Sequence, residues 1–199
     1  MRIFFLTAFL TFVSISSVCQ NLDIDILKNI NLNRNRNLDR SFRFISNTVS
    51  PVSIAAPLLV VSTGYILKDS VIKRKGLFVA ASVLGAAIIS TGLEYSVDRT
   101  RPFVTYPYLE QAGSAGSPSF PSGHTSSAFS TATSLSIAFP KWYVIVPSFI
   151  WAGSVAYSRM DLGVHYPSDV LAGAVIGSGS AYICYRVNKW LGKKTRSKL

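Results

Sequence analysis

Five apolar segments restrict what this chain can fold into more than any other feature. They are Pro51–Leu67, Gly76–Leu93, Ser126–Phe139, Trp142–Tyr157 and Val170–Val187. A helix that spans a bilayer needs about 20 mainly apolar residues, and polar flanks extend the shorter segments toward that length. Small residues inside the segments, including Gly173, Gly177 and Gly179, favour close helix packing. The pattern predicts an all-α fold: an integral membrane helical bundle with five to six transmembrane helices.

Composition favours a membrane protein over a soluble basic one. Of 199 residues, 49% are hydrophobic, and 20 Lys+Arg against 9 Asp+Glu give a net charge of +11. In a soluble protein this charge would suggest nucleic acid, but no aromatic-rich basic motif accompanies it. The basic residues cluster between and after the apolar segments, where membrane topology and anionic lipid explain them. We therefore expect no nucleic-acid partner.

Four parts of the chain differ in composition. Residues 1–19 have a basic start, an apolar stretch and a small-residue end, which predict a signal peptide or a retained N-terminal anchor. Residues 20–50 are polar and are expected on the outer side of the membrane. Residues 51–187 form the predicted transmembrane domain, and residues 188–199 form a basic cytoplasmic tail.

The polar segment contains one amphipathic stretch. Phe42, Ile45 and Val49 recur at three- and four-residue spacing, with arginines between them. This spacing predicts a short helix, either lying on the membrane surface or forming a solvated connection.

Basic residues in the connections predict the orientation of the bundle. They are Lys68, Lys73, Arg74, Lys75, Lys141, Lys189, Lys193, Lys194, Arg196 and Lys198. If the helices alternate in direction, all of these lie on one side, and the positive-inside rule makes that side cytoplasmic. Residues 94–124 and 158–169 then face the outside. The basic stretch at 34–43 is an exception on that outer side.

The sequence Pro121-Ser122-Gly123-His124 opens the third apolar segment. Backbone N–H groups at a helix start are unpaired and favour an anion, and glycine lets the backbone approach it. A histidine there can protonate a leaving oxygen. The alternative is an ordinary helix start in which Ser122 serves only as the cap.

A second polar motif, Ser158-Arg159 followed by His165 and Asp169, precedes the last apolar segment. Asp169 can reach back to His165, fix its tautomer and leave the other ring nitrogen free to attack. Arg159 can bind phosphate oxygens with its guanidinium. Arg101 can do the same, because Pro102 ends the second helix and places Arg101 at its end. The alternative is a loop with surface Arg and His and a capping Asp. Together the motifs suit phosphate chemistry through a covalent histidine, without a metal.

These motifs resemble those of the type 2 phosphatidic acid phosphatase (PAP2) superfamily, whose relatives include bacterial lipid phosphatases and vanadium haloperoxidases. The family pattern is Lys-x6-Arg-Pro, Pro-Ser-Gly-His and Ser-Arg-x5-His-x3-Asp. The second and third motifs are complete here, and the similarity covers roughly residues 51–187. The resemblance implies a PAP2/haloperoxidase-like helical core with its site at the membrane surface.

The resemblance also implies a role for each matching residue. His165 is the expected nucleophile that forms a phosphohistidine, and Asp169 orients it. His124 is the expected general acid for the leaving group and then the base for water. The expected phosphate-binding residues are Arg101, Ser122, Gly123 and Arg159. No metal, no cofactor and no obligate protein partner are expected.

The first motif departs from the family, because Glu94 occupies the position of its lysine. We hypothesise that Glu94 pairs with Arg101 or Arg99, and that Arg99 supplies the missing positive charge. The other interpretation is a weakened or inactive site.

The sequence thus predicts a phosphatase integral to the bacterial inner membrane, with its active site facing the periplasm or outside. Its predicted substrate is a lipid-linked phosphate monoester or pyrophosphate within the bilayer. Candidate substrates are phosphatidic acid, phosphatidylglycerol phosphate, undecaprenyl pyrophosphate and a lipid A phosphate. The alternative is a catalytically weakened PAP2-like protein that binds phospholipid headgroups. A haloperoxidase is disfavoured, because such relatives are typically larger and soluble.

Overall fold

The computed structural model describes residues 22–196, and this part of the chain consists of helices and connections without a β-strand. Residues 22–32 form an N-terminal helical segment. The later elements are η1 (Arg36–Leu38), α2 (Asp39–Asn47), α3 (Val49–Ile66), α4 (Ser70–Val97), α5 (Pro102–Thr105), α6 (Gly123–Ala138), α7 (Trp142–Asp161) and α8 (Pro167–Arg196). The all-α prediction is confirmed. The predicted signal peptide or anchor at 1–19 lies outside the described residues.

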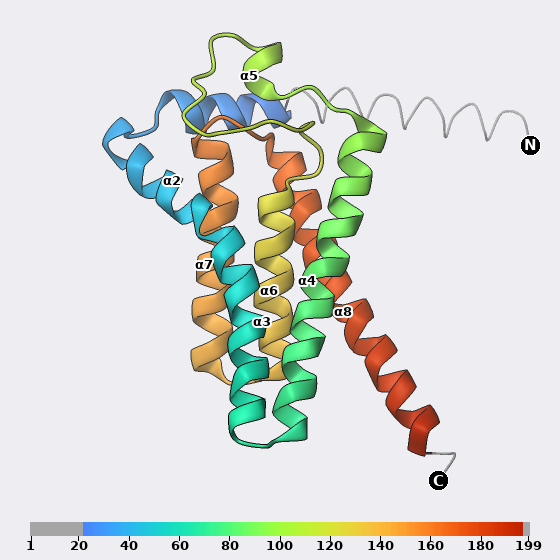
Figure 1. The fold of residues 1–199 in the computed structure, drawn as a ribbon. Coiled ribbons are helices and arrows are strands. Elements are labelled where there is room, and N and C mark those ends of the chain that lie inside the picture. Colours follow the sequence, from blue (N-terminus) through green and yellow to red (C-terminus); the bar gives the residue numbers. More distant parts are fainter. Residues whose placement is uncertain (1–21, 197–199) are drawn as a thin grey trace, which may run out of the picture.

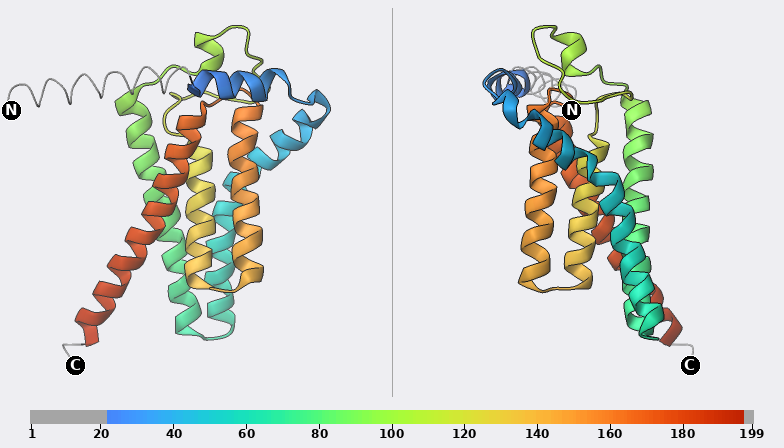
Figure 2. Two further views of the ribbon diagram at one scale, coloured as in Figure 1. Left: turned by 180° about the vertical axis from the view of Figure 1, so that it is seen from behind. Right: turned by 60° about the vertical axis from the view of Figure 1, so that its left-hand side comes forward.

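Five long helices form a bundle with one loop-rich end (Figures 1 and 2). The α3–α4 and α6–α7 turns lie at the opposite end of the bundle. The N-terminal helical segment, α5 and the long connection before α6 lie across the loop-rich end. Helix α6 is central and packs against α3, α4, α7 and α8. The connections that carry both polar motifs therefore share one end, as the alternating topology predicts.

The outer faces of the helices are apolar. Exposed side chains include Ile66, Leu84, Ile88, Ile150 and Leu171. Large apolar side chains exposed on several helices are typical of proteins that meet a membrane. Within the described residues, three stretches are long and apolar enough to cross a membrane: 36–66, 70–105 and 167–190. The count of five to six spans stays a prediction.

Helices α6 and α8 approach each other closely because α8 has glycine at the contact. A Cβ atom added to Gly173 would lie 2.6 Å from the Ser122 carbonyl oxygen, and one added to Gly177 would lie 2.2 Å from that of Ser126. These two glycines confirm the predicted close packing. The third, Gly179, faces open space, so it is not part of the contact.

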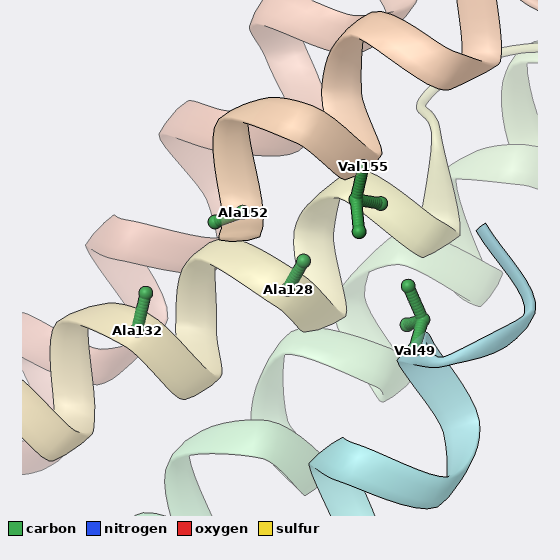
Figure 3. Close-up of a cluster of buried hydrophobic side chains, with 5 residues drawn as sticks. All are labelled: Val49, Ala128, Ala132, Ala152 and Val155. Atoms are coloured by element: carbon green, nitrogen blue, oxygen red, sulfur yellow. The ribbon is translucent and has the colours of Figure 1, made fainter. Parts of the chain in front are cut away.

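Small side chains also fill the other face of α6 (Figure 3). Ala128 and Ala132 pack with Ala152 and Val155 of α7 and with Val49 at the start of α3. With so little side-chain bulk between them, the three helices are held at short separations.

Helix α2 covers the upper part of α7. The Phe42 ring lies 5.5 Å from the Tyr157 ring, and Ile45 packs against the cluster that contains Val49. Phe42 and Ile45 of the predicted amphipathic stretch therefore pack α2 against the bundle. Its position relative to a membrane surface stays a prediction.

The glycine contact gives a matched stability test. We expect Gly177→Ala to lower the free energy of unfolding by about 1–3 kcal/mol, because the added methyl group overpacks against the α6 backbone. Gly179→Ala, on the same helix but facing open space, should cause no loss, since alanine is the better helix former. Thermal unfolding in detergent measures both. Equal effects of the two substitutions would contradict the close contact.

Candidate active site

The predicted site residues meet at the loop-rich end of the bundle, each placed by the end of a helix. Arg101 immediately precedes α5, Ser122 caps α6 by accepting the N–H of Thr125, and Arg159 lies in the last turn of α7. His165 lies in the α7–α8 connection and Asp169 in the first turn of α8.

Backbone hydrogen bonds tie these helix ends together. The Ser122 N–H donates to the Asp169 carbonyl oxygen over 3.0 Å, which joins the start of α6 to the start of α8. The Arg159 carbonyl oxygen accepts the N–H groups of Val164 and His165 over 3.2 and 3.3 Å. Gly163 makes the turn after α7 with a left-handed φ of +70°, which glycine adopts without steric cost.

The imidazole of His165 is 2% exposed and held in one orientation. Its Nδ1 lies 2.8 Å from the Ser119 carbonyl oxygen, and its Nε2 lies 3.3 Å from Nη1 of Arg101. Because a carbonyl oxygen only accepts, Nδ1 carries the proton in this contact. The lone pair of Nε2 is thus directed toward the Arg101 guanidinium.

Asp169 supports His165 mainly through Ser119. Its Oδ2 lies 3.6 Å from His165 Nδ1, too long for a hydrogen bond. The same Oδ2 accepts the Ser119 hydroxyl over 2.5 Å and the Tyr166 N–H over 3.0 Å. Sequence reasoning missed Ser119, since nothing in the motif spacing distinguishes it from other serines.

The guanidinium groups of Arg101 and Arg159 are held largely by uncharged groups. Arg101 donates to the carbonyl oxygens of Ser117 and Val164 over 2.7 and 2.8 Å. Arg159 donates to the Ser46 hydroxyl over 2.6 Å and to the Ser114 carbonyl oxygen over 3.3 Å. Carbonyl and hydroxyl oxygens fix the side chains without neutralising them, so both positive charges are available to an anion.

A pocket of about 240 Å³ opens beside Arg159, between α2 and the connection before α6. Arg43, Ser46 and Ser114 are among its lining residues. The buried Nε of Arg159 has no hydrogen-bond partner in the described part of the chain. This unused donor beside an open pocket is a place for an oxygen atom of a bound anion.

The two histidines lie outside the three stretches long and apolar enough to cross a membrane. Burial lowers the pKa of His165 to about 4, aided by the charges of Arg159 and Arg101 and opposed by Asp169. Burial also lowers the pKa of His124 to about 3, aided by Arg159, His165 and Arg101. Both rings are therefore neutral at pH 7 when the site is empty. A bound phosphate brings opposite charge, which favours protonation of His124.

Arg99 does not take the place of the missing lysine. Its guanidinium donates to Oδ1 of Asp169 over 2.5 Å and to Oδ2 of Asp23 over 2.8 Å. The hypotheses that Arg99 pairs with Glu94, or supplies charge to the phosphate, are wrong, because two carboxylates already neutralise this group. The reason is local: α4 ends at Val97, and Asp98 adopts a left-handed φ of 48° that redirects the chain.

Glu94 itself lies close to the Pro-Ser-Gly-His turn. A Cβ atom added to Gly123 would lie 3.0 Å from Oε1 of Glu94. The carboxylate is near Ser117 and within electrostatic reach of Arg101. It thus adds negative charge next to the predicted phosphate position. Among the described residues, no group of three or more His, Cys, Asp or Glu side chains is arranged to hold a metal.

The fold and site together define an all-helical membrane protein with two arginines and two histidines gathered at one end of its bundle. Residues 75–193 match the model of the PAP2 superfamily, and the chain belongs to that superfamily. The match covers the three motifs and the four helices that carry them, α4, α6, α7 and α8.

Individual relatives carry lipid phosphatase names. The chain is 31% identical over 96 residues to the lipid A 4'-phosphatase of Bacteroides thetaiotaomicron, covering 48% of this chain and 43% of that protein. It is 32% identical over 117 residues to the undecaprenyl-diphosphatase of Sulfolobus acidocaldarius, covering 58% and 56%. The alignments thus span about half the length of these relatives.

Solved structures share the fold. The Aquifex aeolicus LpxE structure superposes with a TM-score of 0.72 at 25% identity, covering 83% of this chain and 95% of that one. The phosphatidylglycerolphosphate phosphatase of Bacillus subtilis, a transmembrane PAP2 protein, superposes with a TM-score of 0.74 at 22% identity, covering 92% and 95%. The latter likeness concerns the fold alone.

The charge of Glu94 can be tested by anion binding without turnover. A unit charge a few ångströms away in a hydrated site contributes about 1 kcal/mol, which corresponds to about fivefold in Kd. We expect Glu94→Gln to lower the Kd for inorganic phosphate by about that factor. Asp98→Asn, which removes an exposed charge just beyond the same helix, is the matched control. Isothermal titration calorimetry in detergent measures both, and an unchanged or weaker affinity in Glu94→Gln would contradict the repulsion.

Proposed function

We propose that this protein is a membrane phosphatase that hydrolyses a lipid-linked phosphate monoester or pyrophosphate through a phosphohistidine on His165. One observation carries the proposal: the neutral imidazole of His165 is fixed through Nδ1, with Nε2 3.3 Å from a guanidinium that no carboxylate neutralises directly. A nucleophile held beside a guanidinium that makes no direct carboxylate contact suits attack on a phosphate.

The first step transfers the phosphoryl group to the enzyme. Arg101, Arg159 and the N–H groups at the start of α6 bind the phosphate oxygens and stabilise their negative charge. Nε2 of His165 attacks phosphorus in line, and the bond from phosphorus to the leaving oxygen breaks. His124 donates a proton to that oxygen. The products are a phosphohistidine and the dephosphorylated lipid, or a lipid monophosphate from a pyrophosphate.

The second step releases inorganic phosphate. His124, now neutral, removes a proton from a water molecule as the water oxygen attacks phosphorus. The phosphorus–nitrogen bond breaks, and its electron pair returns to Nε2 of His165. Ser119 and Asp169 hold the ring through both steps, so the same nitrogen that attacked becomes the leaving group.

A lipid substrate and an outward-facing site are supported by position and charge. The site lies at one end of an apolar bundle, where a headgroup meets the helices. Lys68 and Lys141 lie in the α3–α4 and α6–α7 connections at the other end, and Lys73, Arg74 and Lys75 follow in the first turns of α4. The positive-inside rule assigns that end to the cytoplasm. We therefore propose the bacterial inner membrane, with the site facing the periplasm or outside. The named activities of the relatives, on lipid A and undecaprenyl diphosphate, agree with a lipid phosphate as substrate.

Glu94 favours one alternative function. A carboxylate beside the phosphate position opposes the negative charge of the phosphoryl group during transfer, so the protein would bind phospholipid headgroups with little or no hydrolysis. Turnover distinguishes the two functions directly.

The direct test is phosphate release by detergent-purified protein. The panel contains phosphatidic acid, phosphatidylglycerol phosphate, undecaprenyl pyrophosphate and lipid A. We expect release from at least one lipid and a loss of roughly 10³-fold or more in His165→Ala, because the nucleophile is removed. Alkaline quenching and mass spectrometry of the His165 peptide should detect the phosphohistidine. Release that survives in His165→Ala would exclude this nucleophile, and no release by a folded wild-type protein would favour the headgroup-binding alternative.

The lowered histidine pKa values predict an unusual pH profile. Protonation of His165 removes its attacking lone pair, so kcat/KM should fall as the pH drops through about 4 rather than through the ordinary value of 6.5. His124 is neutral in the empty site, so a phosphate monoanion must bring the proton that it donates. With a second phosphate pKa near 6, kcat/KM should also fall above about pH 6. Measuring kcat/KM against pH for two substrates of different phosphate pKa tells the two falls apart, because only the fall at high pH should move with the substrate. A fall at low pH centred near 6.5 would contradict the burial of His165.

A further inference from the structure

The N-terminal helical segment, residues 22–32, crosses the loop-rich end of the bundle next to the site (Figure 1). It lies before the region matched by the PAP2 model, which begins at residue 75. One of its side chains, Asp23, is only 6% exposed. Its Oδ1 accepts the N–H of Ser168 over 2.8 Å, and its Oδ2 accepts the Ser168 hydroxyl over 2.5 Å. Asp23 is thus fixed directly against the start of α8.

Asp23 and Asp169 bind the same guanidinium. Nη2 of Arg99 donates to Oδ2 of Asp23 over 2.8 Å, while Nη1 donates to Oδ1 of Asp169 over 2.5 Å and to Oγ of Ser168 over 2.7 Å. The guanidinium carbon also lies 3.9 Å from the centre of the Tyr166 ring. Two carboxylates, one hydroxyl and one aromatic face therefore define the position of Arg99.

This arrangement controls a carboxylate that cannot reach water. Asp169 is 0% exposed, and a buried charge is tolerated only where it is paired and hydrogen-bonded. Among the described residues that contact its carboxylate, only Arg99 brings a full positive charge in a direct hydrogen bond. Because Asp23 fixes the position of the Arg99 guanidinium, it also fixes the position of Oδ1 of Asp169. The other oxygen, Oδ2, binds Ser119, whose carbonyl oxygen orients His165.

We propose that Asp23 is a positioning residue for phosphoryl transfer. It holds one edge of Arg99, Arg99 holds Asp169, and Asp169 with Ser119 holds the imidazole of His165. The N-terminal helical segment is then part of the catalytic apparatus. This inference rests on the function proposed above, because its measured effect is on the reaction of His165.

The segment has separate anchors, so the role of Asp23 can be tested without undocking it. The side chain of Asn31 is buried and donates to the carbonyl oxygens of Glu110 and Asp161, both over 3.0 Å. Its Oδ1 accepts the Glu110 N–H over 2.9 Å. Leu27 packs in a buried cluster with Leu109 and Tyr166. These contacts remain when Asp23 is changed.

The experiment compares Asp23→Asn with Asp25→Asn, an exposed carboxylate on the same helical segment. We expect Asp23→Asn to lower kcat about 10- to 100-fold, the effect of a small misplacement of a reacting group, with KM within about twofold of wild type. Asp25→Asn should leave both constants unchanged. Asp23→Glu keeps the charge and should recover part of kcat. In an Arg99→Ala background, Asp23→Asn should cause no further loss, because Asp23 acts through Arg99.

A second measurement needs no turnover. The ¹⁵N resonances of the His165 imidazole report its tautomer and its protonation. We expect Asp23→Asn to shift these resonances and Asp25→Asn to leave them in place, with unchanged thermal unfolding in both variants. An unchanged kcat, an effect on KM alone, equal effects of the two variants, or full additivity with Arg99→Ala would each overturn the positioning role. If wild-type protein releases no phosphate, the proposed function fails, and unshifted His165 resonances would then overturn the positioning role separately.

Discussion

A carboxylate with no access to water, that of Asp169, determines how the loop-rich end of this bundle is built. An ionised group can stay there only if charged and polar partners replace its lost hydration. Those partners come from Arg99, beyond the end of α4, from Ser119, in the long connection before α6, and from the Tyr166 backbone. Two segments distant in sequence, those of Arg99 and Ser119, are thereby brought to the start of α8. The orientation of His165 follows from the same contacts, because Ser119 binds both the carboxylate and the imidazole.

The close pairing of α6 and α8 provides the rigid base for these contacts. The Pro-Ser-Gly-His turn begins α6 and the His165–Asp169 pair precedes and begins α8, so the distance between the two histidines depends on the spacing of these helices. Gly173 and Gly177 bring the backbones together, and the hydrogen bond from Ser122 to Asp169 joins their first turns. The proposed reaction needs such a base, because small displacements of the reacting groups are costly.

The sequence was sufficient to predict the helices and the residues of the two complete motifs, because both depend on local patterns. Apolar runs set the helices, and each motif lies where a helix begins or ends. The contacts of Asp23 and Ser46 were not predictable in this way: they join residues 145 and 113 positions apart, and neither residue stands out in a polar segment. The hypothesis that Glu94 pairs with Arg101 or Arg99 placed Glu94 and Arg101, seven residues apart, on nearly the same helix face. The left-handed Asp98 ends that helix and turns Arg99 toward Asp169.

Arg159 shows how such a site can change its preference while keeping its chemistry. Its guanidinium is fixed by a hydroxyl of α2 and a carbonyl of the connection before α6, and both segments line the pocket beside it. The histidines, in contrast, are carried by the glycine-packed helix pair. Changes in α2 and this connection would therefore alter the size and charge of the pocket without disturbing the helix pair.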